Sequence, residues 1–253
     1  MFNLKHRLEY VLARRKIQDL PNQKLRQFFQ ENLFLDKSHY NTHDLRKNEN
    51  TKDLYKEIMK LRSVSTFKLK TTIPHQEMLA EAQKLNSLFV DHRKDPNWGW
   101  KALTIHGTRP DHTEDYYVYG FNDRESANYQ WTEIAEKCPV TTKWLKEMWP
   151  FDIFQRVRFV LLEPGAAILP HNDTDGERGF FAVNISLNQP FGCLMAMQGY
   201  GIVPWQPGEV RLMDIGLKHS VVNLSNENRY HMIIHGHADK NFEVYRDFIA
   251  NSI

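Results

Sequence analysis

The sequence predicts a mainly β protein with a helical N-terminal region and a short C-terminal helix. Residues 156–237 consist of short apolar runs rich in β-forming residues, and Pro, Gly and Asn separate these runs. Such a pattern is typical of strands joined by turns. Apolar residues recur at helical spacing in residues 4–35 and 74–92, and the final stretch 241–253 also resembles a helix.

The first part of the chain is predicted to be mostly helical. Apolar spacing predicts helices over residues 4–12 and 24–35, and a further short helix at 52–61. The intervening residues 36–51 are polar, with little to bury, and are predicted to form a loop.

The next segment leads into the sheet. Residues 63–73 alternate like a strand, and Pro74 opens a helix that is predicted to continue to about His92. We therefore expect residues 1–95 to form a mostly helical region packed on the sheet. Residues 96–253 are expected to form the β domain, and the two parts to make one compact unit.

Composition narrows the possible functions. The chain has 253 residues, of which 41% are apolar and 25% charged, and its net charge is +2. So small a charge gives no general attraction to nucleic acid, and no apolar run is long enough for a signal peptide or a membrane span. The two cysteines, Cys138 and Cys193, are too few for a disulfide framework. We expect a cytoplasmic protein without nucleic-acid or membrane partners, and the oligomeric state stays open.

A charged and aromatic loop follows the first predicted strand of the β domain, which alternates over residues 98–105. In folds where rigid strands position variable loops, such loops commonly carry the residues that contact substrate. The candidate substrate contacts are His106, Arg109, His112, Tyr116, Tyr117 and Tyr119. The alternative is that this Tyr-rich stretch only packs against the rest of the protein.

The main sheet is predicted to begin near Arg156. Arg156 and Arg158 fall on one face of a strand, with Val157 and Phe159 on the other. An arginine that faces inward is costly unless it meets a carboxylate, so Arg158 is a conditional candidate for binding an anion. Exposure at the surface is the alternative for this residue.

The remaining elements complete the expected sheet. Residues 140–148 predict a helix, and the segments 180–186, 192–198 and 208–214 predict further strands.

Three residues near the centre of the chain have the pattern of a metal site. His171 and Asp173 are two residues apart, so on an extended backbone both side chains project from the same face. His219 precedes a later alternating run and can supply a third ligand. Two histidines and one carboxylate form the ligand set of non-haem Fe(II) oxygenases.

The surroundings of this motif make it specific. A His followed two residues later by Asp or Glu occurs four times in the chain, so the bare motif is weak. Only the copy at His171 has a strand-like run before it, a histidine 48 residues later and an arginine ten residues beyond that. This arginine, Arg229, can hold the distal carboxylate of 2-oxoglutarate in a bidentate pair. The alternative is a surface arginine beside a solvated histidine.

The segment EPGAAILPHND, followed by NISLNQPFGC, WQPGEVRLMD and HSVVN, resembles the catalytic domain of the aspartyl/asparaginyl β-hydroxylase family, which includes bacterial proline hydroxylases. The resemblance covers about residues 98–236 and is sharpest from Glu163 onward. It implies a double-stranded β-helix, a cupin-like jelly roll. It also implies Fe(II), 2-oxoglutarate and molecular oxygen as cofactor and cosubstrates.

The resemblance assigns roles to particular residues. His171 and His219 match the family's metal histidines, and Arg229 matches its 2-oxoglutarate arginine. Asp173 stands where animal β-hydroxylases have lost the carboxylate ligand and related bacterial members keep it. Asn184 replaces a family histidine near 2-oxoglutarate.

Two arginines complete the candidate site. Arg158 is a candidate for the proximal carboxylate of 2-oxoglutarate or for the substrate, and Arg178, in a turn-rich loop beside the metal motif, is a candidate for a substrate carboxylate.

The predicted reaction is hydroxylation of an unactivated C–H bond of an amino acid, free or within a polypeptide, of the Asp, Asn or Pro type. Succinate and CO2 are the expected co-products. Because the cofactor carries the difficult step, no catalytic acid or base of the protein is expected. The alternative is a cupin-type metal-binding protein with an isomerase or ligand-binding role. A rival metal site at His231, His235 and His237 is also conceivable.

Overall fold

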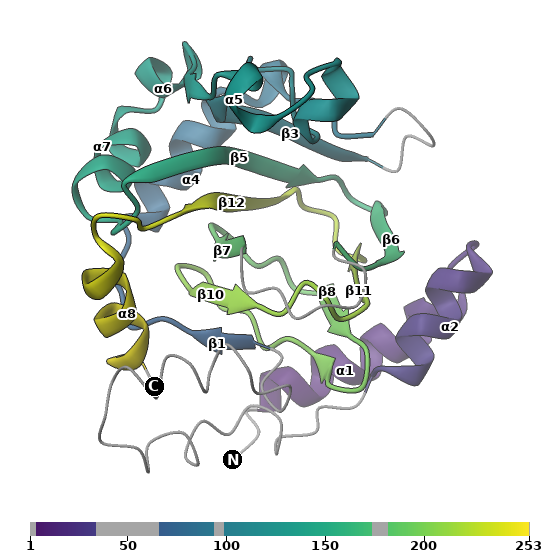
Figure 1. Cartoon of the computed structure of the whole chain (residues 1–253). Coiled ribbons are helices and arrows are strands. Elements are labelled where there is room, and N and C mark those ends of the chain that lie inside the picture. The colour runs from purple at the N-terminus through teal and green to yellow at the C-terminus, as the bar shows by residue number, and fades with distance from the viewer. Residues whose placement is uncertain (1–3, 34–65, 94–98, 174–181, 253) are drawn as a thin grey trace.

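Two antiparallel β-sheets form the body of the protein in this computed structural model, which describes residues 4–33, 66–93, 99–173 and 182–252. The large sheet contains β1 (Thr66–Lys68), β2 (Val90–Asp91), β3 (Trp100–Gly107), β4 (Gln130–Trp131), β5 (Ile153–Leu162), β7 (Ala182–Ser186), β10 (Val210–Met213) and β12 (Arg229–His237). The small sheet contains β6 (Ala167–His171), β8 (Cys193–Met197), β9 (Gly201–Ile202) and β11 (His219–Asn223). Figure 1 shows the two sheets curving around a common interior.

From β5 to β12 the chain crosses repeatedly between the two sheets, with the consecutive strands β8 and β9 both in the small sheet. The order across the large sheet is β1-β10-β7-β12-β5-β3-β2, with β4 paired to β3, and across the small sheet it is β6-β11-β8-β9. A chain that crosses repeatedly between two facing antiparallel sheets forms a jelly roll, or double-stranded β-helix. The predicted fold class is therefore confirmed.

Helices cover the outer face of the large sheet. These are α4 (His75–Lys84), α6 (Ile134–Lys137), α7 (Pro139–Glu147) and α8 (Phe242–Ala250), while η3 (Asn86–Leu88), η4 (Tyr116–Tyr119) and α5 (Arg124–Ala127) are short turns of helix. Met78, Leu145 and Ile249 from three of the helices pack with Phe159 and Met232 of the sheet into one apolar core. Burial of each such side chain contributes about 1.5–3 kcal/mol, so this layer supplies much of the stability.

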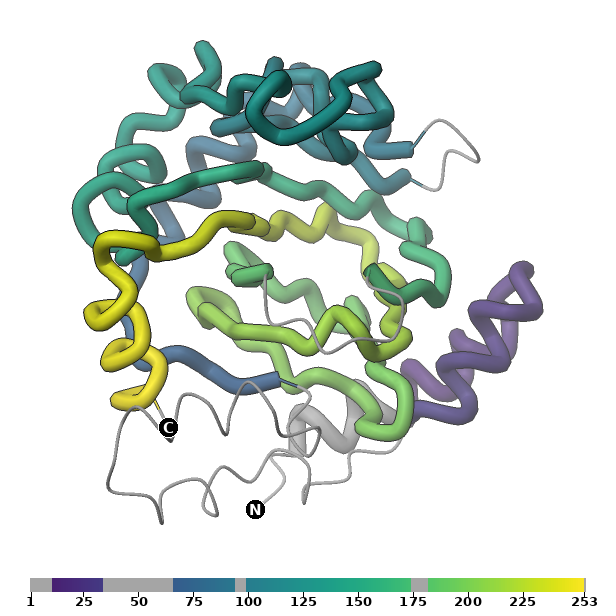
Figure 2. The backbone as a smooth tube through the Cα atoms, in the orientation of Figure 1, coloured from purple at the N-terminus to yellow at the C-terminus, as the bar shows by residue number. Residues whose placement is uncertain are grey.

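A helical hairpin covers the outer face of the small sheet. It consists of α1 (Leu4–Gln18) and α2 (Gln23–Glu31), and the side chain of Asn22 caps α2 by accepting a hydrogen bond from the backbone N–H of Leu25 at 3.0 Å. Phe29 and neighbouring apolar residues pack against Leu194 and Val222 of the sheet. Figure 2 shows the hairpin and α8 at opposite ends of the molecule.

The predicted helix from Pro74 to His92 is wrong in its extent. α4 ends at Lys84, a single 3-10 turn follows, and Val90 pairs with Ala102 of β3. Pairing with β3 outweighs the local helical spacing here. The backbone N–H and C=O groups of β2 and of the edge of β3 satisfy each other, whereas a longer helix would leave the edge of β3 without a partner at this place.

Of the other predictions for the N-terminal region, one is confirmed in part, two lie outside the described residues and one stays a prediction. Of the predicted strand 63–73, β1 covers Thr66–Lys68. The predicted loop 36–51 and helix 52–61 lie outside the described residues. The boundary between residues 95 and 96 stays a prediction, although β1 and β2 join the same sheet as the later strands.

The two faces of β5 differ as the alternation predicts. Arg156 and Arg158 line the interior between the sheets, and Val157 and Phe159 belong to the outer apolar core. The free cysteines Cys138 and Cys193 are both buried.

Candidate metal centre and its cavity

A cavity of about 750 Å³ lies between the two sheets. Its walls come from the inner faces of β5, β7 and β12 of the large sheet and of β6, β8 and β11 of the small sheet, and the loop after β3 adds further lining residues. This volume is in the usual range for a ligand site.

The three predicted metal residues converge on the small-sheet side of this cavity. β11 pairs with β6, which places His219 directly opposite His171, and Asp173 follows two residues after β6 ends. The Asp173 carboxylate lies 3.4 Å from Nε2 of His171 and 3.6 Å from Nε2 of His219. One ligand atom from each residue lies within 4.8 Å of the others. Two ligands that are each about 2.1 Å from one ion lie about 3–4 Å apart, so these spacings are close to those that a bound metal requires.

The backbone fixes which nitrogen of each histidine faces the carboxylate. Nδ1 of His171 lies 2.8 Å from the carbonyl of Leu169, and Nδ1 of His219 lies 2.9 Å from the carbonyl of Leu217. A carbonyl can only accept, so each Nδ1 donates its hydrogen and each neutral Nε2 presents a lone pair. This is the tautomer that metal-binding histidines need.

The electrostatics of the group also suit a cation. Burial lowers the pKa of His219, and the nearby His171 lowers it further, so the neutral ring is favoured. Burial alone would raise the pKa of Asp173, but when the two rings are protonated, a hydrogen bond from His171 and the charges of His219 and His171 hold it well below its usual range, so the carboxylate stays ionised. Two lone pairs and a carboxylate that meet without a proton between them repel one another, and a divalent cation removes that repulsion.

A buried arginine without a counter-charge faces the same cavity. Arg229, the first residue of β12, is 3% exposed, and its Nε has no hydrogen-bond partner. Its Nη2 donates to Nδ1 of His231 at 3.0 Å, and Nε2 of His231 lies 3.2 Å from Oδ1 of Asn184. No carboxylate among the described residues forms an ion pair with Arg229. Burial lowers its pKa, so an anionic ligand would stabilise this guanidinium.

Arg158 is buried rather than exposed at the surface. It is 6% exposed and lines the cavity, which decides against the surface alternative. Its guanidinium donates to the carbonyl of Thr113, and Nη1 lies 3.4 Å from Nε2 of His92. Burial, and then the neighbouring Arg156, lower the pKa of Arg158 to about 9.

The predicted substrate residues separate into three groups, and His112, Tyr116 and Tyr119 belong to the group that does not line the cavity. Tyr117 lies at the cavity wall and is 66% exposed. His106 is instead buried beside Trp131, with ring centroids 4.8 Å apart, and Arg109 pairs with Asp111 at 3.1 Å; neither lines the cavity. Arg178 lies outside the described residues.

Several contacts in the cavity could not be predicted from the sequence. His92 and Trp100 line the cavity with ring centroids 4.2 Å apart, and the Trp100 ring lies 6.3 Å from that of His171. His231 shares a strand face with Arg229, a spacing visible in the sequence, but its contact with Asn184 depends on the pairing of β12 with β7.

The rival metal site does not form within the part of the chain that the structure describes. His231, His235 and His237 all line the cavity, but the group that brings metal-ligand atoms together consists of His171, Asp173 and His219.

No described helix combines the length and apolar character needed to cross a bilayer.

Two solved structures show a distant likeness to this chain. A 2OG-Fe(II) oxygenase family oxidoreductase from Burkholderia pseudomallei is 14% identical, covering 77% of this chain and 95% of that one, with a TM-score of 0.46. A Pseudomonas putida prolyl-4-hydroxylase is also 14% identical, covering 74% of this chain and 100% of that one, with a TM-score of 0.42. Both likenesses are distant.

The family assignment comes from the sequence itself. Among curated protein sequences, none matches the chain. The sequence model of the family described as aspartyl/asparaginyl beta-hydroxylase matches residues 48–238 of this chain. This range is most of the chain, and it includes the motif segments from Glu163 onward. The resemblance inferred from those segments is thereby confirmed, and the chain belongs to the aspartyl/asparaginyl β-hydroxylase family.

Proposed function

We propose that this protein is an Fe(II)- and 2-oxoglutarate-dependent dioxygenase that hydroxylates an unactivated C–H bond of an amino acid, free or within a polypeptide. Succinate and CO2 are the co-products. One observation carries the proposal: a cluster of two histidines and a carboxylate shares a cavity with Arg229, a buried guanidinium that has no counter-charge among the described residues.

The metal centre is assigned to His171, Asp173 and His219. Both histidines direct Nε2 towards the cluster, and the ligand set of two imidazoles and one carboxylate is the one that non-haem Fe(II) oxygenases use. Fe(II) bound there, together with 2-oxoglutarate and oxygen, would supply the oxidising power for hydroxylation. Because Asp173 keeps its ligand position, hydroxylation is favoured over halogenation.

Arg229 is assigned to the distal carboxylate of 2-oxoglutarate. Its planar guanidinium can bind a carboxylate through two parallel hydrogen bonds. His231 accepts one N–H of Arg229 and donates its other ring N–H to Asn184, so these two residues hold the arginine in position. The apolar side chains Ile168 and Met195 line the same cavity and exclude water from the bound cosubstrate.

The remaining interior residues are left for substrate. Arg158 and Tyr117 line the cavity, and both are proposed to contact the substrate. A small amino acid or a peptide is the proposed partner, and a cytoplasmic location stays a prediction.

The proposal is tested by uncoupled turnover. Purified protein with Fe(II), ascorbate and oxygen should convert 2-oxoglutarate slowly to succinate without any added substrate. His171→Ala should abolish this conversion, and Arg15→Gln, which changes an exposed arginine on α1, serves as the matched control. A cupin-type binding protein would bind metal but form no succinate, and that result would refute the proposal.

A further inference from the structure

A tryptophan that does not line the cavity packs behind the arginine assigned to 2-oxoglutarate. Trp205 is buried in the connection between β9 and β10. Its ring meets the ring of His231 at an interplanar angle of 87°, with the two centroids 5.0 Å apart. His231 in turn accepts a hydrogen bond from Arg229. A single ring therefore separates Trp205 from the cosubstrate arginine.

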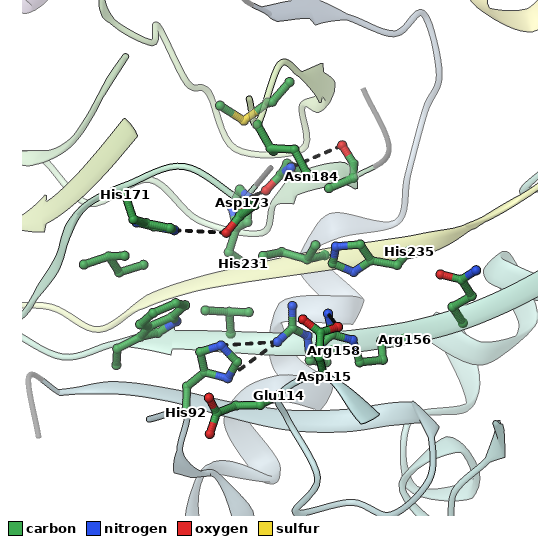
Figure 3. Close-up of a pocket in the computed structure, with 18 of the residues that line it drawn as sticks. His92, Glu114, Asp115, Arg156, Arg158, His171, Asp173, Asn184, His231 and His235 are labelled. Carbon is green, nitrogen blue, oxygen red and sulfur yellow. Dashed lines mark hydrogen bonds and ion pairs between the residues drawn. The ribbon is translucent and has the colours of Figure 1, made fainter. Parts of the chain in front are cut away.

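The hydrogen bonds of His231 hold the ring at its two nitrogens. A guanidinium can only donate, so Nδ1 of His231 accepts from Arg229, and Nε2 carries the hydrogen that it donates to Oδ1 of Asn184 at 3.2 Å. Figure 3 shows His231 and Asn184 in the wall of the cavity. With one hydrogen bond at each nitrogen, the ring can still tilt about the line that joins the two nitrogens. Contact with the Trp205 ring opposes this tilt.

Trp205 is itself held at its indole nitrogen and over its ring. Its Nε1 donates to Sδ of Met195 at 3.5 Å, and Cζ of Arg211 lies 5.4 Å from the ring centroid. A guanidinium over an indole ring is attracted to it. Arg211 also donates to the carbonyl of Pro204, the residue before Trp205, at 3.4 Å. The ring and the adjoining peptide group are therefore both fixed.

The charge of Arg211 is balanced, which distinguishes this arginine from Arg229. Oε2 of Glu209 lies 3.0 Å from Nε and 2.9 Å from Nη2 of Arg211. The other carboxylate oxygen of Glu209, Oε1, lies 3.2 Å from Nζ of Lys68. A guanidinium with its own carboxylate does not require an anionic ligand. Arg211 therefore supports Trp205 and is not a second site for the cosubstrate.

Trp205 also connects the two sheets. Met195 belongs to β8 of the small sheet, whereas His231 belongs to β12 of the large sheet. The strand β8 pairs with β11, which carries His219. A molecule of 2-oxoglutarate that binds both the metal and Arg229 must bridge the same two sheets. The distance that it has to span therefore depends on how the sheets are held together.

We propose that Trp205 is a positioning residue for 2-oxoglutarate, which acts through His231 to keep Arg229 at the distance from the metal centre that the cosubstrate requires. The inference rests on the proposed function, and it adds a residue outside the cavity to the cosubstrate site. Without the indole, His231 can tilt and the Arg229 guanidinium can turn away from the bound carboxylate. A contact between two aromatic rings contributes an energy that corresponds to about two- to tenfold in a binding constant.

The first experiment compares two tryptophans. 2-Oxoglutarate is titrated calorimetrically into the anaerobic protein with Fe(II), for the unaltered chain, Trp205→Phe and Trp144→Phe. Trp144 of α7 is also buried, but it packs in the outer apolar core. Both substitutions should lower the free energy of unfolding. Only Trp205→Phe should weaken the binding of 2-oxoglutarate, by about two- to tenfold.

The affinity for Fe(II) alone is measured in the same proteins. His171 and His219 lie on strands of the small sheet, and Asp173 follows the first of them, so the metal ligands do not depend on the contact between Trp205 and His231. Fe(II) affinity without 2-oxoglutarate should therefore be the same in the unaltered chain and in Trp205→Phe.

The second experiment tests whether Trp205 acts through His231. Trp205→Phe is repeated in a His231→Gln background, in which the ring that Trp205 contacts is absent. The effects of residues that act through one another are not additive. The double variant should therefore bind 2-oxoglutarate about as tightly as His231→Gln alone.

The outcomes separate the inference from the proposed function. If the unaltered protein with Fe(II) does not bind 2-oxoglutarate, the proposed function fails. If it binds and Trp205→Phe binds equally tightly, or if Trp144→Phe weakens binding to the same extent, the inference is overturned. Two substitutions whose effects multiply independently in the double variant would overturn it as well. Trp205→Tyr, which keeps more of the ring volume, takes the place of Trp205→Phe if that variant does not fold.

Discussion

The two faces of the central strands β5 and β12 contrast sharply in chemistry. The outer face carries apolar residues such as Phe159 and Met232, each fully or almost fully buried in a dry core. The inner face of the same strands carries Arg158, Arg229 and His235, which are buried without the partners that their charges or lone pairs require. Adjacent residues therefore have different roles. The outward-facing apolar side chains stabilise the fold, whereas the inward-facing polar side chains are unfavourable to bury and are available to bind ligands.

The largest expected effect is on the outer face. Phe159→Ala should lower the free energy of unfolding by about 3–5 kcal/mol, because it removes a fully buried ring and leaves a cavity. Urea unfolding followed by circular dichroism measures the change. The KM for 2-oxoglutarate in the folded fraction should stay within about twofold, since the ring does not line the cavity. A change in KM as large as that of Arg229 variants would show that the two faces are not separate.

On the inner face, Arg229→Met should act in the opposite direction on stability. Loss of the carboxylate partner should weaken 2-oxoglutarate binding by about 2–5 kcal/mol. The unliganded protein should unfold at a higher temperature than the original, because a buried charge without a counter-charge is replaced by an apolar side chain. Thermal unfolding with and without 2-oxoglutarate measures both effects. A lower Tm for the unliganded variant would mean that Arg229 stabilises the fold.

The buried histidines should make stability depend on pH. Burial lowers the pKa of His231 and His235 well below the ordinary value, so the unfolded chain binds more protons than the folded one just below about pH 6.5. The part of the free energy of unfolding that depends on these two histidines should therefore be at its full value above pH 6.5. It should fall on acidification, by up to about 1.4 kcal/mol per pH unit for each histidine. Unfolding curves from pH 7 to pH 5 test this. His231→Gln should reduce the slope, and an unchanged slope would contradict the assignment.

The smallest expected effect is on the helical hairpin of α1 and α2, which covers the outer face of the small sheet. Asn22→Ala removes the cap of α2 and should cost about 1 kcal/mol, while Asn22→Gly should cost only a few tenths. The metal centre lies on the inner side of that sheet, so metal affinity should be unaltered in both variants. Weaker metal binding in Asn22→Ala would show that the helical hairpin supports the centre from outside.

The sequence was informative wherever the chemistry depends on short spacing. His171 and Asp173 two residues apart, and Arg156 and Arg158 on one strand face, follow from the geometry of an extended chain. Which face of that strand meets the cavity does not follow, since it depends on how the two sheets pack. For this reason the buried position of Arg158 was only one of two alternatives.

The structural features that the sequence did not predict depend on long-range packing. The helix predicted to reach His92 ends at Lys84 because Val90 pairs with a strand ten or more residues away, a contact that no local pattern reveals. His92 enters the cavity through the same pairing and then contacts Thr113 at 3.0 Å, in a loop that follows the next strand. His106 has the right composition for a substrate residue, but its strand turns it towards Trp131 and away from the cavity.

The most direct test of the central idea is an anaerobic titration of the Fe(II)-loaded protein with 2-oxoglutarate, repeated without metal, with His171→Ala and with Arg229→Met. One equivalent of 2-oxoglutarate should bind tightly to the Fe(II)-loaded protein and at least tenfold more weakly in each of the other three samples. Equal binding with and without metal, or to His171→Ala, would contradict a shared site for the metal and the dicarboxylate.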